Sequence, residues 1–109
     1  LMMQHEKADD WVISTGETHT VREFANIAFA RANLDYEEFV QTSKKYFRPN
    51  EVDHLLGDNS KAKKILGWEP ETSFTDLVEL MVTSDLEKAK QEKVLVENNL
   101  LKPTWENPI

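Results

Sequence analysis

Charged side chains of both signs lie close together in the stretch YFRPNEVDHLLGDNSKAKKILGWEP, residues 46–70. Arg48 stands directly before a proline, which favours extended backbone and keeps the arginine out of a helix. Its planar guanidinium can bind a phosphate through two parallel hydrogen bonds. Glu51 follows three residues later, and its carboxylate can accept hydrogen bonds from both hydroxyls of a ribose, as acidic residues do in dinucleotide sites.

This pair allows two interpretations. In the first, Arg48 and Glu51 together hold a nucleoside diphosphate by its phosphates and its ribose. In the second, they form an ion pair on the surface, which contributes about 0–1 kcal/mol to stability. The spacing alone is compatible with both.

No other pattern of catalytic or cofactor-binding residues is complete. The three glycines, at positions 16, 57 and 67, are too far apart for a G-x-G-x-x-G loop, so no dinucleotide cradle is predicted. The histidines at 5, 19 and 54 lack the spacing of metal ligands. Thr15 and Glu17 pair a hydroxyl with a carboxylate, but we expect them in a turn. The sequence therefore predicts no catalytic residue and no metal site, and we do not expect the chain alone to be an enzyme.

The composition limits the class of protein. A chain of 109 residues with 39% hydrophobic residues can form one globular domain with one modest core. A formal net charge of −7 argues against a nucleic-acid partner but allows a small anionic ligand. No apolar run reaches the roughly 20 residues of a membrane helix. The absence of cysteine suits the reducing cytoplasm.

Two long helices should frame the charged stretch. Thr20 and Glu23 form a capping box before a helix over 20–33, and Ser73 caps a helix over 74–90. A short helix over 60–66 should begin at Asp58 or Asn59 and end at Gly67 in the left-handed conformation. We expect the helices to pack around one apolar core: Trp11, Phe24, Leu66, Trp68, Leu77 and Met81.

The remaining segments predict little regular structure. Residues 11–15, WVIST, are rich in β-branched side chains and predict a strand, and a second short extended piece is expected near Val40. A strand needs neighbours, so the sheet should be completed by another segment or subunit. The expected fold class is α/β, mostly helical with one or two short strands. Residues 1–90 should form the domain and 91–109 an extended tail.

Three blocks of the chain resemble, in order and spacing, the C-terminal part of the GDP-mannose 4,6-dehydratases. The blocks are TGETHTVREF, YFRPNEVDHLLGDNSKAKKILGWEP and SFTDLVELMVTSDL. These enzymes are a branch of the extended short-chain dehydrogenase/reductase family. The resemblance covers about residues 1–90, and the uncapped start at LMMQHEK fits a chain that is part of a longer protein.

The resemblance implies a lyase that converts GDP-mannose to GDP-4-keto-6-deoxymannose with NADP. An N-terminal Rossmann domain, absent from this chain, would bind NADP, and the whole enzyme would be a homo-oligomer. Carried over to this sequence, Arg48 contacts the diphosphate and Glu51 the ribose hydroxyls, while Asp53 and Asp58 remain structural. The family's Tyr-x-x-x-Lys pair has no match here, because Tyr36 is followed four residues later by Val40, and Tyr46 by Asn50.

Two alternatives stay open. The chain could be a stand-alone sensor of nucleotide sugars, or an assembly module that completes another subunit. We expect no nucleic-acid or membrane partner in any of the three cases.

Overall fold

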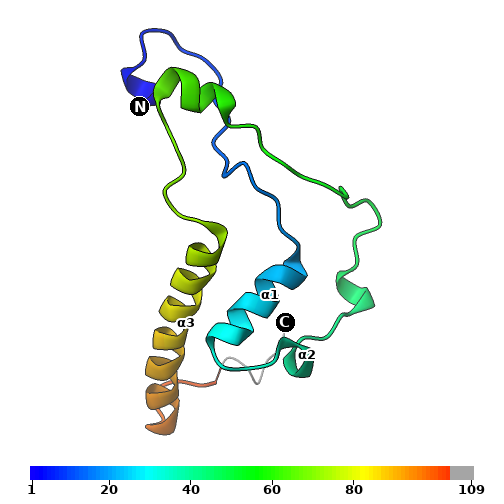
Figure 1. The fold of residues 1–109 in the computed structure, drawn as a ribbon. Helices are drawn as coiled ribbons and strands as arrows, with labels where there is room; N and C mark the ends of the chain where they lie inside the picture. Colours follow the sequence, from blue (N-terminus) through cyan, green and yellow to red (C-terminus); the bar gives the residue numbers. More distant parts are fainter. Residues whose placement is uncertain (104–109) are drawn as a thin grey trace.

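All regular elements of the described part of the chain, residues 1–103 of a computed structural model, are helical. Three are α-helices, two are short 3₁₀ turns and one is a single π-helical turn. In chain order they are η1 (Met2–Gln4), α1 (Val21–Arg31), α2 (Tyr36–Phe39), η2 (Lys44–Tyr46), η3 (Ala62–Leu66) and α3 (Phe74–Glu97). The expected mostly helical fold is confirmed, and Figure 1 shows α1 beside α3.

Both long helices begin where the sequence predicts. The Thr20 hydroxyl accepts a hydrogen bond from the Glu23 amide at 3.1 Å, and the Glu23 carboxylate accepts one from the Thr20 amide at 3.0 Å. The Ser73 hydroxyl accepts a hydrogen bond from the Asp76 amide at 3.2 Å. Because each cap satisfies amides that the first helical turn leaves unpaired, local sequence alone fixes these starts.

The end of the second long helix was predicted wrongly. α3 continues to Glu97, so residues 91–97 are helical where an extended tail was expected. Ala89 and Val96 lie seven residues apart on one helix face, so the apolar spacing resumes after the polar run QEK. The last six residues of the expected tail, 104–109, lie outside the described residues. None of the described helices has the length and apolar composition needed to cross a membrane.

The predicted strand at 11–15 does not form: residues 1–103 contain no strand, and so no α/β sheet. These residues run between the N-terminal turn and α1 without a β partner (Figure 1). A strand's backbone groups need a neighbouring strand, and the described chain supplies none. Val40 is extended, with φ −95° and ψ 123°, but it follows the unpredicted helix α2 and belongs to no ladder.

The short helix before Gly67 lies where the sequence places it. The Asp58 carboxylate accepts a hydrogen bond from the Ser60 amide at 2.9 Å, and the chain is helical from there to Leu66. Its last turn, η3, has π geometry, which the sequence did not predict. Gly67 has the predicted left-handed conformation, with φ 66°.

One lobe of the molecule combines residues 1–15 with residues 57–68, and we call it the N-terminal lobe. Buried Asn59 donates a hydrogen bond from its side-chain amide to the Ser14 carbonyl at 2.6 Å. The Lys61 ammonium lies 2.9 Å from the Asp9 carboxylate and 4.9 Å from the centre of the Trp11 ring. These contacts join segments more than forty residues apart in sequence.

The second lobe, which we call the helical lobe, consists of α1, α2 and α3. Val78 of α3 is fully buried, and Phe24 of α1 meets Phe74 edge-on, with ring centres 6.2 Å apart. Arg31 and Glu79 form an ion pair between the two helices. The chain crosses between the lobes through residues 16–20, 69–73 and the long stretch before η3 (Figure 1).

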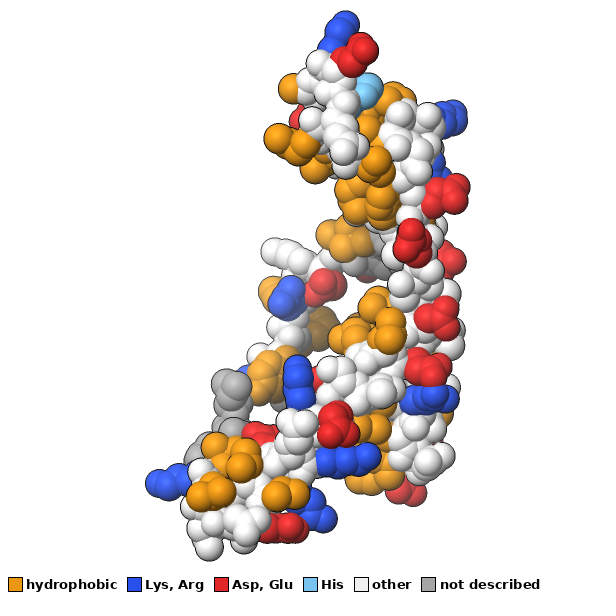
Figure 2. Space-filling model, turned by 90° about the vertical axis from the view of Figure 1, so that its left-hand side faces the viewer, with side chains coloured by type: hydrophobic (Ala, Val, Ile, Leu, Met, Phe, Trp, Pro, Cys, Tyr) orange, Lys and Arg blue, Asp and Glu red, His pale blue; other side chains and the backbone are white. Residues whose placement is uncertain are grey.

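The two lobes leave the molecule open. Its radius of gyration is 19.3 Å, whereas a compact domain of this size has about 13 Å. Its accessible surface is 10049 Å², whereas a folded monomer of 12.7 kDa exposes about 6,200 Å². Figure 2 shows apolar side chains on the surface of both lobes. The single predicted core is therefore wrong: its residues are divided between the lobes, and Leu77 and Met81 are 42% and 46% exposed.

Candidate functional site

Arg48 and Glu51 lie in the irregular segment that joins η2 to η3. In Figure 1 this segment bows outward on the side of the molecule opposite α3. Phe47, just before Arg48, has extended backbone with φ −67° and ψ 130°. Arg48 lies outside any helix, as the following proline predicts, and both Arg48 and Glu51 are exposed.

Arg48 and Glu51 do not form the surface ion pair with each other that was the second interpretation of their spacing. Neither Arg48 nor Glu51 makes a hydrogen bond or an ion pair with any residue of the described part of the chain. Both charged groups can therefore meet a ligand without first breaking an internal contact. Whether they bind one stays a prediction.

Asp53 and Asp58, the next two acidic residues after Glu51, differ in their contacts. Asp58 caps the short helix, and the hydrogen bond from the Ser60 amide holds the pKa of its carboxyl below the usual value of 3.8. The structural role expected for Asp58 is confirmed. Asp53 is exposed and pairs with no described residue, so the structure gives it no such role.

The charge of the chain is unevenly distributed, and the sequence analysis missed this. Residues 41–68 contain six Lys or Arg and three Asp or Glu, a net +3, which leaves −10 for the rest of a chain of net −7. Lys44 and Lys45 of η2 lie just before Arg48 in this segment. The Lys45 ammonium lies 5.5 Å from the centre of the Tyr46 ring. A charge count by segment would have found these lysines.

The described residues do not fit a dinucleotide cofactor. Such a cofactor is held where a strand leads through a glycine-rich loop into a helix. Residues 1–103 contain no strand, and Gly16, Gly57 and Gly67 lie in three separate segments of the chain. The same residues contain no group of three or more His, Cys, Asp or Glu side chains that could hold a metal ion.

Comparison with known proteins shows the family. The family described as GDP-mannose 4,6 dehydratase matches residues 1–81, and the chain belongs to it. GDP-mannose 4,6 dehydratase 1 of Arabidopsis thaliana is 53% identical over 97 residues, which cover 89% of this chain and 27% of that protein. The GDP-mannose 4,6 dehydratase of Dictyostelium discoideum is 45% identical over 107 residues, covering 83% of this chain and 30% of the relative. The human protein of that name is 38% identical over 104 residues, which cover 80% of this chain and 28% of the human protein.

The chain thus spans about a quarter to a third of the length of these relatives. The resemblance inferred from the three sequence blocks is confirmed. The family match ends at residue 81, inside α3, so residues 82–97 of that helix lie beyond it.

Proposed function

We propose that this chain is the C-terminal substrate-binding part of a GDP-mannose 4,6-dehydratase and that it holds the GDP moiety of GDP-mannose. The complete enzyme, a lyase, would convert this substrate to GDP-4-keto-6-deoxymannose with NADP in the cytoplasm. Family membership supports the substrate class. The structural observation that carries the proposal is that Arg48 and Glu51 are both exposed, make no ion pair within residues 1–103, and lie in a segment of net positive charge in an acidic chain.

The two residues have separate tasks in this proposal. The guanidinium of Arg48 donates two hydrogen bonds to oxygens of the diphosphate, because its fork matches that geometry. The carboxylate of Glu51 accepts hydrogen bonds from the ribose hydroxyls. In a nucleoside diphosphate the ribose and the phosphates are adjacent, which is compatible with two contacting residues three positions apart in the chain.

The charge distribution supports an anionic ligand at this segment. GDP is strongly negative and would be repelled by the net −10 of the remaining chain. Lys44 and Lys45, next to Arg48 in sequence, offset that repulsion locally. Such exposed charges act mainly on the rate of encounter, which depends on ionic strength.

The open surface supports a covering domain. The chain exposes roughly 3,800 Å² more than a compact monomer of its mass, including the apolar side chains of Val12, Ile13 and Phe47. We propose that the Rossmann domain of the same enzyme covers residues 1–90 and pairs with the extended segment 11–15. That domain would also bind NADP and supply the catalytic residues, so the 109-residue chain alone should have no dehydratase activity.

Calorimetric titration of the 109-residue chain with GDP tests the proposed grip. Arg48→Ala should weaken binding by about tenfold to a hundredfold, as loss of a hydrogen-bonded charged group does. Arg22→Ala is the matched control, because Arg22 is exposed on α1, outside the positive segment. Equal affinity of the wild type and Arg48→Ala, or equal losses in both variants, would show that Arg48 does not hold the diphosphate.

A further inference from the structure

Asp53 is a charged side chain that neither the fold nor the proposed grip on GDP uses. It lies two residues after Glu51, is exposed, and makes no hydrogen bond or ion pair with any residue from 1 to 103. It does not cap a helix as Asp58 does. A carboxylate in this positive segment opposes the attraction of phosphate. A contact between Asp53 and the ligand therefore requires a part of the ligand that offers hydrogen-bond donors rather than negative charge.

The order of groups along a nucleoside diphosphate matches the order of side chains along this segment. In such a ligand the ribose lies between the diphosphate and the base. Because Arg48 takes the diphosphate and Glu51 the ribose in the proposed grip, the base lies on the side of Glu51 away from Arg48. Asp53 is the next acidic residue in that direction. Two residues of extended chain span about 7 Å, which is comparable with the distance from the ribose hydroxyls to the far edge of a purine.

The backbone allows Glu51 and Asp53 to face the same ligand. Residues 47–59 contain no helix and no strand, and residues 51–56 are all exposed. In extended chain, side chains two residues apart face the same side and the residue between them faces the other side. Val52 can therefore turn away from the ligand while both carboxylates face it.

We propose that the carboxylate of Asp53 recognises the guanine base, accepting hydrogen bonds from N1–H and from the 2-amino group through its two oxygens. This inference rests on the proposed binding of GDP and adds the residue that selects the base. Asp53 would determine specificity and take no part in the reaction itself.

The hydrogen-bonding edge of guanine fits a carboxylate better than that of any other common base. Guanine alone presents two adjacent donors there, and a carboxylate offers two parallel acceptors. Adenine presents an acceptor, N1, beside its 6-amino group, so one carboxylate oxygen would face a lone pair. Selection would therefore combine an attraction for guanine with a repulsion of adenine.

The polar residues on either side of Asp53 fit this task less well. Asn50 precedes Glu51, on the side of the diphosphate in the proposed grip. His54 follows Asp53 directly, so in extended chain it faces the opposite side. The two ring nitrogens of a histidine also diverge, and they cannot both accept from one edge of a base.

Calorimetric titration with GDP, ADP and xanthosine diphosphate tests the proposal on the 109-residue chain, because the three ligands differ only in the base. The wild type should bind GDP at least about tenfold more tightly than ADP. Asp53→Asn should lower the affinity for GDP by about tenfold. The same variant should gain affinity for xanthosine diphosphate, since an asparagine amide can accept from N1–H of xanthine and donate to its 2-oxo group.

ADP separates recognition of the base from a simple effect of charge. Loss of one negative charge would raise the affinity for all three anionic ligands, whereas recognition of the base lowers that for GDP and raises that for xanthosine diphosphate relative to ADP. The variant should also weaken GDP and a GDP without ribose hydroxyls by the same factor, because Asp53 does not contact the ribose.

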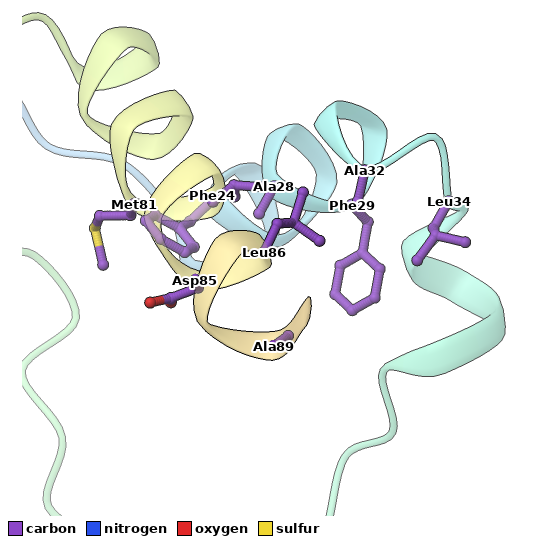
Figure 3. A pocket seen from close by; sticks show the side chains of 10 residues that line it. Phe24, Ala28, Phe29, Ala32, Leu34, Met81, Asp85, Leu86 and Ala89 are labelled. Atoms are coloured by element: carbon purple, nitrogen blue, oxygen red, sulfur yellow. The ribbon is translucent and has the colours of Figure 1, made fainter. Parts of the chain in front are cut away.

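Asp85→Asn is the matched control for Asp53→Asn. Asp85 belongs to the helical lobe and lies at the apolar groove between α1 and α3 (Figure 3), outside the positive segment. It is exposed, so the same chemical change there should leave all three affinities as they are in the wild type.

Equal affinities of the wild type for GDP and ADP would overturn the role of Asp53, as would an Asp53→Asn variant that gains affinity for all three ligands alike. In both cases a loss of all three ligands in Arg48→Ala would show that the grip on the diphosphate still stands. A chain that binds none of the three ligands would overturn both proposals.

Discussion

The imidazole ring of His19 lies flat on the ring of Phe74, with centres 3.8 Å apart and an angle of 6° between the planes. Its Nδ1 lies 3.2 Å from the Glu23 carboxylate and its Nε2 lies 3.1 Å from the Glu17 carboxylate. Phe74 is the first residue of α3, and Glu23 belongs to the capping box of α1. His19 therefore joins the starts of the two long helices.

This contact should make the stability of the helical lobe depend on pH. Only the protonated ring can donate to both carboxylates, and the hydrogen bond to Glu17, followed by that to Glu23, raises the pKa of His19 above 6.5 although partial desolvation opposes the shift. A raised pKa in the folded state means that the stabilisation is complete below 6.5 and is lost as the pH rises through the folded-state pKa. Urea unfolding midpoints should therefore fall over that interval.

Two variants isolate this effect. His19→Gln should flatten the pH dependence, because glutamine does not titrate. His54→Gln should leave it unchanged, since His54 is exposed and contacts no described residue through a hydrogen bond or ion pair. A pH profile that is the same in the wild type and in His19→Gln would contradict the role of His19.

Removal of the α1 cap should destabilise the same lobe. Thr20→Ala removes the hydroxyl that accepts a hydrogen bond from the Glu23 amide. This change should lower the free energy of unfolding by about 1 kcal/mol. Thr18→Ala serves as the control, because Thr18 is exposed and its side chain makes no hydrogen bond with any residue from 1 to 103. Equal unfolding free energies for the two variants would show that the capping box contributes nothing.

The N-terminal lobe should be sensitive to a single methyl group. A Cβ added at Gly57 would lie 2.4 Å from the Cβ of Ser14, closer than packed carbons can be. Gly57→Ala should therefore cost about 1–3 kcal/mol, measured by urea unfolding. Ser14→Gly removes the opposing carbon, so the double variant should recover part of the loss. A double variant that is less stable than the sum of the single changes predicts would argue against this close approach.

Replacement of Glu51 should weaken binding through the ribose hydroxyls rather than through the phosphates. Glu51→Gln should lower the affinity for GDP by about tenfold, since a hydrogen bond to a charged group contributes about 1.5–3 kcal/mol. The same change should hardly affect 2′,3′-dideoxy-GDP, which lacks both hydroxyls. Asp53→Asn is the control, because Asp53 is an exposed acid of the same segment. Equal losses of affinity for both ligands would show that Glu51 does not contact the ribose hydroxyls.

The parts of the fold that the sequence predicted correctly are those decided by neighbouring residues. The cap at Thr20, the cap at Ser73 and the left-handed Gly67 each depend on a side chain or a glycine acting within one turn. The structure confirms all three.

The predictions that were wrong or missing concern features that depend on distant partners or on weak local signals. Residues 11–15 have strand composition, but pairing decides strand formation, and the described chain offers no partner. α2 and the π-helical turn η3 are too short to show a period. The core prediction assumed one compact body, and the separation of the lobes left Leu77 and Met81 exposed.

The candidate site was only partly predictable. Three sequence blocks identified the family, and the proline after Arg48 indicated an arginine outside a helix. The adjacent lysines, Lys44 and Lys45, were overlooked because each looks like an ordinary surface charge. The net positive charge to which they contribute appears only when the charge of residues 41–68 is compared with that of the remaining chain.

Amide chemical shifts of the 109-residue chain, recorded during titration with GDP, test the central claim most directly. We predict shifts centred on residues 46–53, saturating below millimolar GDP and abolished by Arg48→Ala. The absence of any response at millimolar GDP, or a response centred outside this segment, would contradict the claim that Arg48 and Glu51 hold the nucleotide.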